Sequence, residues 1–316
     1  MLVSSEDGGP PGSDNFLVSV VGPVHRRAGP VAKALKADKH VLCSVPMAPN
    51  QEEAKEVQKR GQAAQSGNSK LLVLCCFQLR CCPPLRDVRD LIVNNLLGVA
   101  NISVVFESRR NWSFMQEGVD ASWWNYRQAG GGVFSAVGIH FVDLIRFLFG
   151  DEIQWVSALQ RPMRGLKVPP KADTPSAEGL CMANFITARK NIPIQMHLNG
   201  VNIGLDEEET MVITSPRASI FFDFMTSELK INTLEKQGTP VDPKPSIVRV
   251  TRDTPASGCA WSVTGMQNLT KRIWSHFEEC ESVHDLATMM DGLQAQRVAD
   301  AVNKSGANNG EWVEIA

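Results

Sequence analysis

A short glycine-rich segment, Gly130 to Asp143, contains the residues with the clearest potential for chemistry. Three consecutive glycines open it, and His140 follows eight residues after the last of them. Histidine changes its charge near neutral pH, so His140 could accept a proton from a reacting group. A purely structural role inside a helix would explain the same residue, and both interpretations stay open.

Cysteine is the other residue type whose spacing could indicate a site. Cys75-Cys76 and Cys81-Cys82 form two vicinal pairs among eight cysteines in the chain. Zinc ligands usually occur as Cys-x2-4-Cys, with further Cys or His at matching spacing, and that pattern is absent here. The sequence therefore predicts buried or half-buried free thiols and no metal site. Reduced thiols fit a cytoplasmic location.

Composition excludes some classes of partner. The chain has 316 residues and a formal net charge of −2, with a pI of about 6.3. Binding to nucleic acid needs a surplus of Lys and Arg to neutralise phosphates, so no nucleic-acid partner is expected. No apolar run approaches the roughly 20 residues that cross a bilayer, and we expect no membrane association.

Strand-like and helix-like segments alternate in the first third of the chain. The strand-like runs cover residues 16–21, 40–43 and 70–77, and the helix-like runs cover residues 26–36, 51–64 and 86–95. The third strand is continuously apolar, as a parallel strand covered on both faces should be. Alternation of this kind predicts a parallel α/β layer, here with three strands.

The pattern changes after Gly98. An apolar helix is predicted over residues 133–149, and strand-like runs follow at residues 153–159, 179–186, 192–201, 210–214 and 218–222. This spacing predicts a mostly antiparallel sheet with one exposed face. Two helices, at about 263–277 and 287–304, and a strand at 312–315 close the chain. We divide it into a disordered arm (1–14), an α/β part (15–98) and a larger part (99–316).

The glycine-rich segment resembles the Gly-Gly-Gly-x-x-x-Asp-x-Gly-x-His-x-x-Asp motif of the Gfo/Idh/MocA family, named after glucose–fructose oxidoreductase and inositol dehydrogenase. Other segments occur in the family's order. Val20–Pro23 looks like the strand end that faces the nicotinamide, Lys39–Pro46 stands where the family has Lys-x-Val-x-x-Glu-Lys-Pro, and Phe77–Arg80 is similar to its Phe-Arg-Phe segment. The likeness runs from about residue 15 to the end and is closest to the glucose–fructose oxidoreductase domain-containing proteins of animals.

The resemblance implies a fold and a chemistry. The fold is α/β plus α+β: a Rossmann-like parallel sheet, truncated here, followed by a larger domain with an open, mostly antiparallel sheet. The implied chemistry is hydride transfer between NADP or NAD and a sugar-like alcohol. The implied cofactor contacts are Val21, Gly22, Pro23, Ser44, Val45 and Pro46. The implied substrate contacts are Arg80, Trp123, Trp124 and Arg127, although packing would also explain the tryptophans and a bond to a helix carbonyl would explain Arg80.

Two departures from the family pattern affect catalysis. The family lysine that hydrogen-bonds the reacting hydroxyl is replaced by Val45, with Ser44 in place of the glutamate. The aspartate of the glycine motif is replaced by Ala136, so only His140 remains of that set. Loss of such groups costs several kcal/mol of transition-state stabilisation each. Reduced or lost activity is therefore expected.

A third departure concerns the phosphates of the cofactor. Family members open with a strand, a Gly-x-Gly-x-x-Gly turn and a helix that bind the pyrophosphate, and no such motif precedes Phe16. The doubly wound sheet of the family has the strand order 3-2-1-4-5-6, and without its first three strands only strands 4, 5 and 6 would remain. The strand at residues 16–21 would then lie at the edge of the sheet. Three readings stay open: an active oxidoreductase, a pseudoenzyme or scaffold, and a partial gene product. The resemblance also implies a homodimer through the large sheet, with the apolar strands at 192–201 and 218–222 supplying its face.

Overall fold

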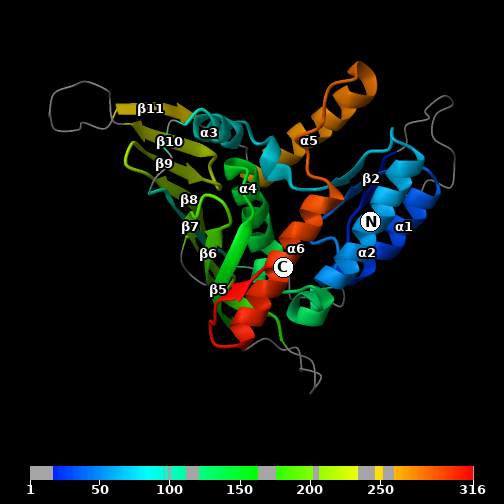
Figure 1. The fold of residues 1–316 in the computed structure, drawn as a ribbon, viewed down its shortest axis with the longest axis horizontal. Coiled ribbons are helices and arrows are strands. Elements are labelled where there is room, and N and C mark those ends of the chain that lie inside the picture. Colours follow the sequence, from blue (N-terminus) through cyan, green and yellow to red (C-terminus); the bar gives the residue numbers. More distant parts are fainter. Residues whose placement is uncertain are drawn as a thin grey trace.

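The structure is a computed structural model that describes residues 17–95, 97–98, 101–111, 121–162, 176–201, 206–233, 246–251 and 260–315. The predicted arm over residues 1–14 lies outside these ranges. Two sheets organise the described residues, a small one near the N-terminus and a large one beside it (Figure 1). The expected fold class, a small parallel sheet followed by a larger and mostly antiparallel one, is confirmed.

The small sheet is parallel and has the strand order β1-β2-β3. Its strands are β1 (Leu17–Val20), β2 (His40–Cys43) and β3 (Val73–Cys75), connected through α1 (Ala28–Lys36) and α2 (Gln51–Gly67). Asn50 caps α2, because its side chain accepts a hydrogen bond from the Glu53 amide at 2.9 Å. Within the described residues β1 is an edge strand, as expected.

Side chains of the small sheet alternate between two apolar clusters. Val41 and Cys43 of β2 pack into the main core with α1 and α2, whereas Leu42 packs with Leu269 and Ile273 of α5 (Ala260–Glu279). Both faces are therefore covered, which explains the continuous apolar run of a parallel strand. A helix that follows the large sheet in the sequence thus completes the small one.

The large sheet has nine strands in the order β11-β10-β9-β8-β4-β7-β6-β5-β12. All neighbours are antiparallel except β4 and β7. The first strand in sequence, β4 (Ser103–Arg109), lies in the middle. The others are β5 (Ile153–Pro162), β6 (Glu178–Thr187), β7 (Pro193–Asn199), β8 (Glu208–Thr214), β9 (Ala218–Asp223), β10 (Glu228–Thr233), β11 (Ser246–Thr251) and β12 (Val313–Glu314).

One face of the large sheet is covered by α4 (Ile139–Phe149), which follows a single π-helical turn, Phe134–Gly138. The ring of Phe141 stacks on Phe106 of β4 with centroids 4.7 Å apart. The helical stretch Arg127–Phe149 is long and apolar enough to cross a membrane, with a mean hydropathy of 1.6. Because 78% of its apolar window is buried inside the protein, it has the character of a core helix.

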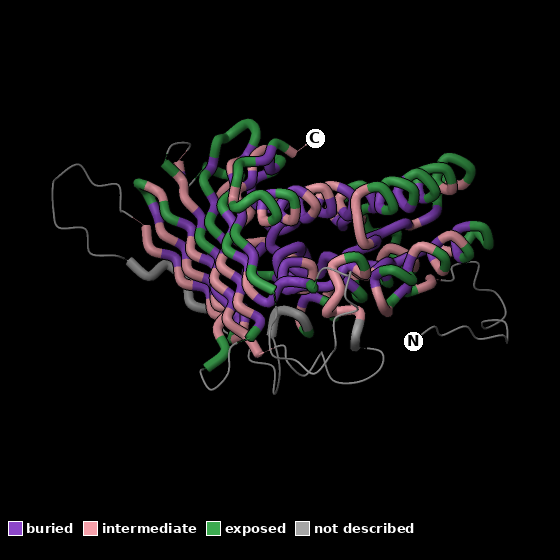
Figure 2. Tube along the Cα trace, turned by 90° about the horizontal axis from the view of Figure 1, so that it is seen from below, coloured by how far each residue is buried: buried purple, intermediate pink, exposed green. Residues whose placement is uncertain are grey.

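The opposite face of the large sheet lacks a helical layer among the described residues, and buried and more exposed residues alternate along its strands (Figure 2). The apolar side chains of β7, including Met196 and Leu198, point to the buried side, and Phe222 of β9 does the same. These three side chains therefore face the interior, and a homodimer face supplied by the strands at 192–201 and 218–222 stays a prediction. Strand alternation places Gln195, His197 and Phe221 on the open face instead.

The C-terminal helix α6 (Met289–Ala307) packs against both sheets, contacting β5 on one side and α2 and β3 on the other (Figure 1). The Cys75 amide of β3 donates a hydrogen bond to the Ala287 carbonyl at 2.8 Å. The shorter helix α3 (Pro83–Val93) packs against α4. The division at residues 98 and 99 stays a prediction, since α5 and α6 belong spatially to both parts.

Candidate active site

The carboxyl ends of the three parallel strands meet the start of α4, and Arg27 connects two of these ends. Its Nε donates to the Gly22 carbonyl at 2.8 Å, and its Nη1 donates to the Pro46 carbonyl. Gly22 follows β1, and Pro46 follows β2 through a cis Val45–Pro46 peptide. Only 7% of Arg27 is exposed. The guanidinium is thus fixed between the two loops that the resemblance assigns to the cofactor.

The triple glycine packs against the same strand end. Gly130 has a φ of +80°, and a Cβ atom at this position would lie 2.7 Å from Cγ1 of Val24. Only glycine permits both this backbone conformation and this close approach. The contact joins the turn before α4 to the segment after β1, so the two sheets meet at the predicted site.

His140 occupies the second residue of α4, next to the end of β3. Its ring lies edge-on to Phe77, with centroids 5.9 Å apart. Burial, and then the positive charge of Arg27, lower the pKa of His140 to about 4. The imidazole is therefore neutral at physiological pH and is a weak base.

The two positions that replace the family's lysine and aspartate lie in the same region. Val45 follows β2, and Ala136 lies in the π-helical turn before His140. Both side chains are half-buried and pack against the main apolar core. Neither side chain can donate or accept a proton, whereas Arg27 and His140, in the same region, each carry nitrogen atoms that can.

Trp123 and Trp124 lie beside the triple glycine, in a 3-10 turn spanning Ala121–Asn125. Their rings are 4.3 Å apart and both side chains are half-buried. The Trp124 carbonyl accepts a hydrogen bond from the Gly132 amide at 3.1 Å, which ties the pair to the turn before α4. The structure thus places this pair beside the turn that leads into α4 and His140. A sugar contact by the two rings stays a prediction.

Arg127 has partners on two strands of the large sheet. Its Nη2 donates to Oε1 of Gln160 at 2.9 Å and lies 3.8 Å from Oε2 of Glu178. Glu178 is buried and also accepts a hydrogen bond from the Phe134 amide at 3.0 Å, which caps the helical segment. Burial raises the pKa of Glu178. Sequence reasoning missed Glu178, because a single acid at the start of a strand has no distinguishing pattern.

Arg80 has a different environment from either interpretation of the sequence. Its Nε and Nη2 bind the two carboxylate oxygens of Asp143 at 2.8 and 2.6 Å, and Nη2 also binds Asp291 at 2.9 Å. Burial lowers the pKa of Arg80, but the two carboxylates more than offset this and raise it above the ordinary value. The side chain is therefore committed to an internal ion-pair network that joins α4 to α6.

The cysteines near the strand ends are free thiols. Cys43, Cys75, Cys76, Cys81 and Cys82 are all buried, as expected, and burial raises the pKa of Cys43 and of Cys76 to about 12. Within the described residues no group of three or more His, Cys, Asp or Glu side chains could hold a metal ion.

The strand ends leave space for the nicotinamide end of a dinucleotide. Val21 is 57% exposed, and Ser44 and Val45 are half-buried. A Cβ atom added at Gly22 would meet nothing within 4 Å. This open, weakly polar ledge at the carboxyl ends of parallel strands is the usual position for a cofactor ring in an open α/β sheet.

The pyrophosphate fits the described residues less well. Phosphate groups bind to free amides at the first turn of a helix. In α2 the Gln51 amide binds Asp300 at 2.7 Å, and the Glu53 amide binds Asn50. In α1, Pro30 removes one amide donor. Residues 17–95 therefore contain no evident seat for the phosphates.

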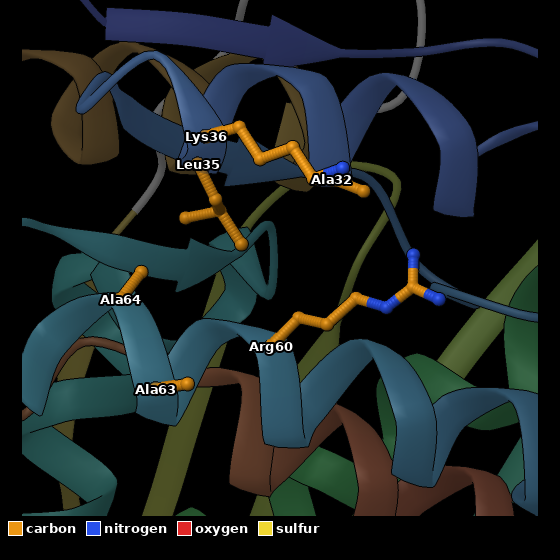
Figure 3. Close-up of a pocket in the computed structure, with 6 residues that line it drawn as sticks. All are labelled: Ala32, Leu35, Lys36, Arg60, Ala63 and Ala64. Atoms are coloured by element: carbon orange, nitrogen blue, oxygen red, sulfur yellow. The ribbon is translucent and has the colours of Figure 1, made fainter.

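A separate hollow of about 500 Å³ lies between α1 and α2 (Figure 3). Lys36 and Arg60 flank it, and Leu35 and three alanines supply its apolar lining. None of its lining residues belongs to the site at the strand ends, so the hollow is separate from the candidate active site.

Comparison with known proteins shows what this chain is similar to. Residues 85–184 match the model of the GFO/IDH/MocA C-terminal domain. An uncharacterized oxidoreductase of Schizosaccharomyces pombe is 26% identical over 217 residues, covering 67% of this chain and 55% of that protein. A 1,5-anhydro-D-fructose reductase of Ensifer adhaerens is 29% identical over 145 residues, covering 46% of this chain and 40% of that protein. The chain thus spans about half the length of the curated relatives it matches.

The fold matches solved structures over almost all of the chain. A levoglucosan dehydrogenase in complex with NADH and levoglucosan superposes with a TM-score of 0.75 and 21% identity, covering 95% of this chain and 80% of that one. At this identity the likeness supports the fold alone. The family-model match, the relatives and the glycine-rich motif before α4 thus agree that residues 85–184 are similar to the GFO/IDH/MocA C-terminal domain.

Proposed function

We propose that the chain acts as an oxidoreductase of the sugar-dehydrogenase type, with less activity than relatives that carry the family's lysine and aspartate. The observation that carries this proposal is the joint between the two sheets. The Val24–Gly130 contact and the Arg27 hydrogen bonds bring the ends of β1 and β2 to the start of α4. His140 lies at this joint, beside the end of β3.

The residues at the joint suit oxidation of an alcohol. A bound nicotinamide dinucleotide would supply the hydride acceptor, and the ledge formed by Val21–Pro23 and Ser44–Pro46 would hold its ring end. The neutral imidazole of His140 takes the hydroxyl proton. The neighbouring rings of Trp123 and Trp124, tilted by 33° to each other, offer an apolar surface for a sugar-like ring. The same groups act in reverse when a carbonyl is reduced.

Reduced activity follows from Val45 and Ala136. Removing one well-placed donor to a developing oxyanion commonly costs about 10²- to 10³-fold in kcat. The decisive comparison is therefore between the wild-type chain and the double variant Val45→Lys/Ala136→Asp, both purified and assayed with sugars and polyols. The variant should exceed the wild type at least about 10-fold in kcat.

Cofactor binding provides the independent test. Titration of the wild-type chain with NADPH and with NADH, followed by cofactor fluorescence, should show saturable binding of one of them. Absence of binding at millimolar concentration for both, in wild type and double variant alike, would overturn the proposal. NADP is the cofactor we expect first, with NAD as the alternative.

A non-catalytic scaffold is the second candidate, and the open face of the large sheet favours it. Leu159 and Met182 are cross-strand neighbours on β5 and β6, and both side chains are about half exposed. Val105 of β4 is 39% exposed on the same sheet. Such apolar residues on an uncovered face suit pairing of two copies into a homodimer.

We place this protein in the cytoplasm, where its many free thiols would stay reduced.

Sedimentation velocity tests the pairing. The wild-type chain should sediment as a dimer at micromolar concentration, and Met182→Arg should shift it toward monomer. Lys36→Glu on α1, far from this face in sequence and structure, is the matched control. A monomeric wild type at these concentrations would refute the dimer without affecting the oxidoreductase proposal.

A further inference from the structure

Among the residues that the structure describes, Arg27 is a buried cation with no carboxylate partner. The side chains around it on the strand ends are the thiols of Cys43, Cys75 and Cys76 and the imidazole of His140. Within the part of the chain that the structure describes, Arg27 forms no ion pair, and its two hydrogen bonds use Nε and Nη1. The Nη2 group therefore has donor capacity that the protein does not use.

Such an arrangement needs an explanation, because removing a guanidinium from water is costly unless its charge is compensated. Two backbone carbonyls compensate part of it. Arginine stays protonated even when burial lowers its pKa, so the remaining charge persists at all physiological pH values. A ligand oxygen at Nη2 would complete the set, and the position lies at the cofactor end of the sheet.

The positions of the carbonyl groups that bind Arg27 indicate which ligand oxygen its Nη2 would bind. Pro46, whose carbonyl binds Nη1, directly follows Val45. Val45 is the position at which the family carries the lysine for the reacting hydroxyl. The guanidinium thus reaches this point from the segment before α1, whereas the family lysine would reach it from the end of β2.

We propose that Arg27 partly replaces the missing lysine at position 45 as the cation of the active site, less effectively than a lysine there would act, and binds the oxygen of the reacting alcohol through Nη2. This proposal rests on the proposed oxidoreductase function. In the oxidation direction the carbon–hydrogen bond of the alcohol would break, and a bound oxidised nicotinamide dinucleotide would accept the hydride. The hydroxyl proton passes to His140, a carbon–oxygen double bond forms, and Arg27 stabilises the negative charge that develops on oxygen.

The first experiment measures turnover of the most active alcohol from the sugar and polyol panel in five chains: wild type, Arg27→Met, Arg27→Lys, Arg27→Met/Val45→Lys and Arg26→Met. The last is the matched control, because Arg26 is the exposed neighbouring cation. We expect Arg27→Met to lower kcat at least about 100-fold and Arg26→Met to change it less than about twofold. Arg27→Met/Val45→Lys should recover at least about 10-fold over Arg27→Met, because a cation returns to the same point.

Folding is monitored in parallel by thermal unfolding, and Arg27→Lys preserves a charge if Arg27→Met does not fold. The proposal is overturned if folded Arg27→Met keeps kcat within about threefold of wild type. It is also overturned if Arg27→Met/Val45→Lys, once folded, shows no recovery, since a purely structural Arg27 would not be replaced by a lysine on another loop.

The second experiment does not depend on turnover. Formate, a small carboxylate, is titrated into each chain while the ring signals of His140 are followed by NMR. Wild type and Arg26→Met should show a saturable change that Arg27→Met lacks. If formate binds in this way but no chain binds a dinucleotide, the proposed function fails while the oxygen site at Arg27 stands. If formate leaves His140 unchanged in wild type, Arg27 offers no such site.

Discussion

Arg80 and Asp143, which are 63 residues apart in the sequence, form a bidentate ion pair inside the protein, with N–O distances of 2.8 and 2.6 Å. Asp291 of α6 binds the same guanidinium, and Arg146 of α4 binds Asp291 at 3.1 Å. This network connects the segment after β3 to α4 and α6, so it fixes the relative positions of the two sheets.

Removal of one partner should leave a buried charge without compensation. We predict that Arg80→Met lowers the free energy of unfolding by about 3–5 kcal/mol, as measured by urea denaturation. Lys59→Met breaks an exposed pair with Glu56 and should cost less than about 1 kcal/mol. Equal losses for the two variants would contradict a stabilising role of the buried network.

Gly132 is the second position where only glycine fits. Its φ is +111°, and a Cβ atom there would lie 2.3 Å from Oε1 of Glu178. We predict that Gly132→Ala destabilises the fold by at least about 2 kcal/mol. Gly67 is the last residue of α2, with nothing within 4 Å of an added Cβ, so Gly67→Ala should stabilise by about 0.4–1 kcal/mol. Thermal unfolding of both variants should show shifts of opposite sign.

The pKa of His140 predicts a pH dependence of stability. The folded value of about 4 lies below the ordinary value of about 6.5, so the unfolded chain takes up a proton first as the pH falls. The neutral His140 makes its full contribution to the free energy of unfolding above about pH 6.5, and this contribution is lost as the pH falls from about 6.5 to about 4. The contribution is at most about 3 kcal/mol. Urea denaturation of His140→Gln across this range should show a shallower dependence than wild type; parallel curves would contradict the prediction.

Thiol reactivity should separate the described cysteines into two groups. Cys280 is exposed, whereas the other cysteines that the structure describes are buried. In a Cys259→Ser background, a maleimide reagent should modify the native protein once, at Cys280. Cys280→Ser in that background should then be unreactive until urea is added. Rapid modification of Cys75 or Cys76 in native protein would show that the strand ends open readily.

The sequence allowed the parallel order of the small sheet, the apolar helix α4 and the antiparallel character of the large sheet to be predicted, because each has a clear period or motif. It did not predict that β4 lies in the centre of the large sheet beside β7. That pairing is non-local and leaves no short-range signal. Helix α3 begins at Pro83, ahead of the predicted start at residue 86, since proline suits the first turn.

The sequence predicted the glycine-rich motif of the site but not which charged side chains lie beside it. His140 and the glycines stand out in a linear pattern, whereas Arg27 and Glu178 act through partners that folding brings to them. The Glu207–Glu209 run shows the same limit, because three consecutive acids look alike in the sequence, yet Glu207 is exposed and Glu209 is fully buried. Spacing along the chain does not report which acid faces the interior.

The contribution of α6 to the small sheet has a consequence for synthesis in the cell. Strands β1 to β3 emerge from the ribosome well before Ala287 and α6, which complete the core around β3. The segment from β1 to β3 must therefore wait, with apolar side chains uncovered, until α6 has been made. Nonsense mutations before residue 287 should consequently yield insoluble fragments rather than a small independently folded unit.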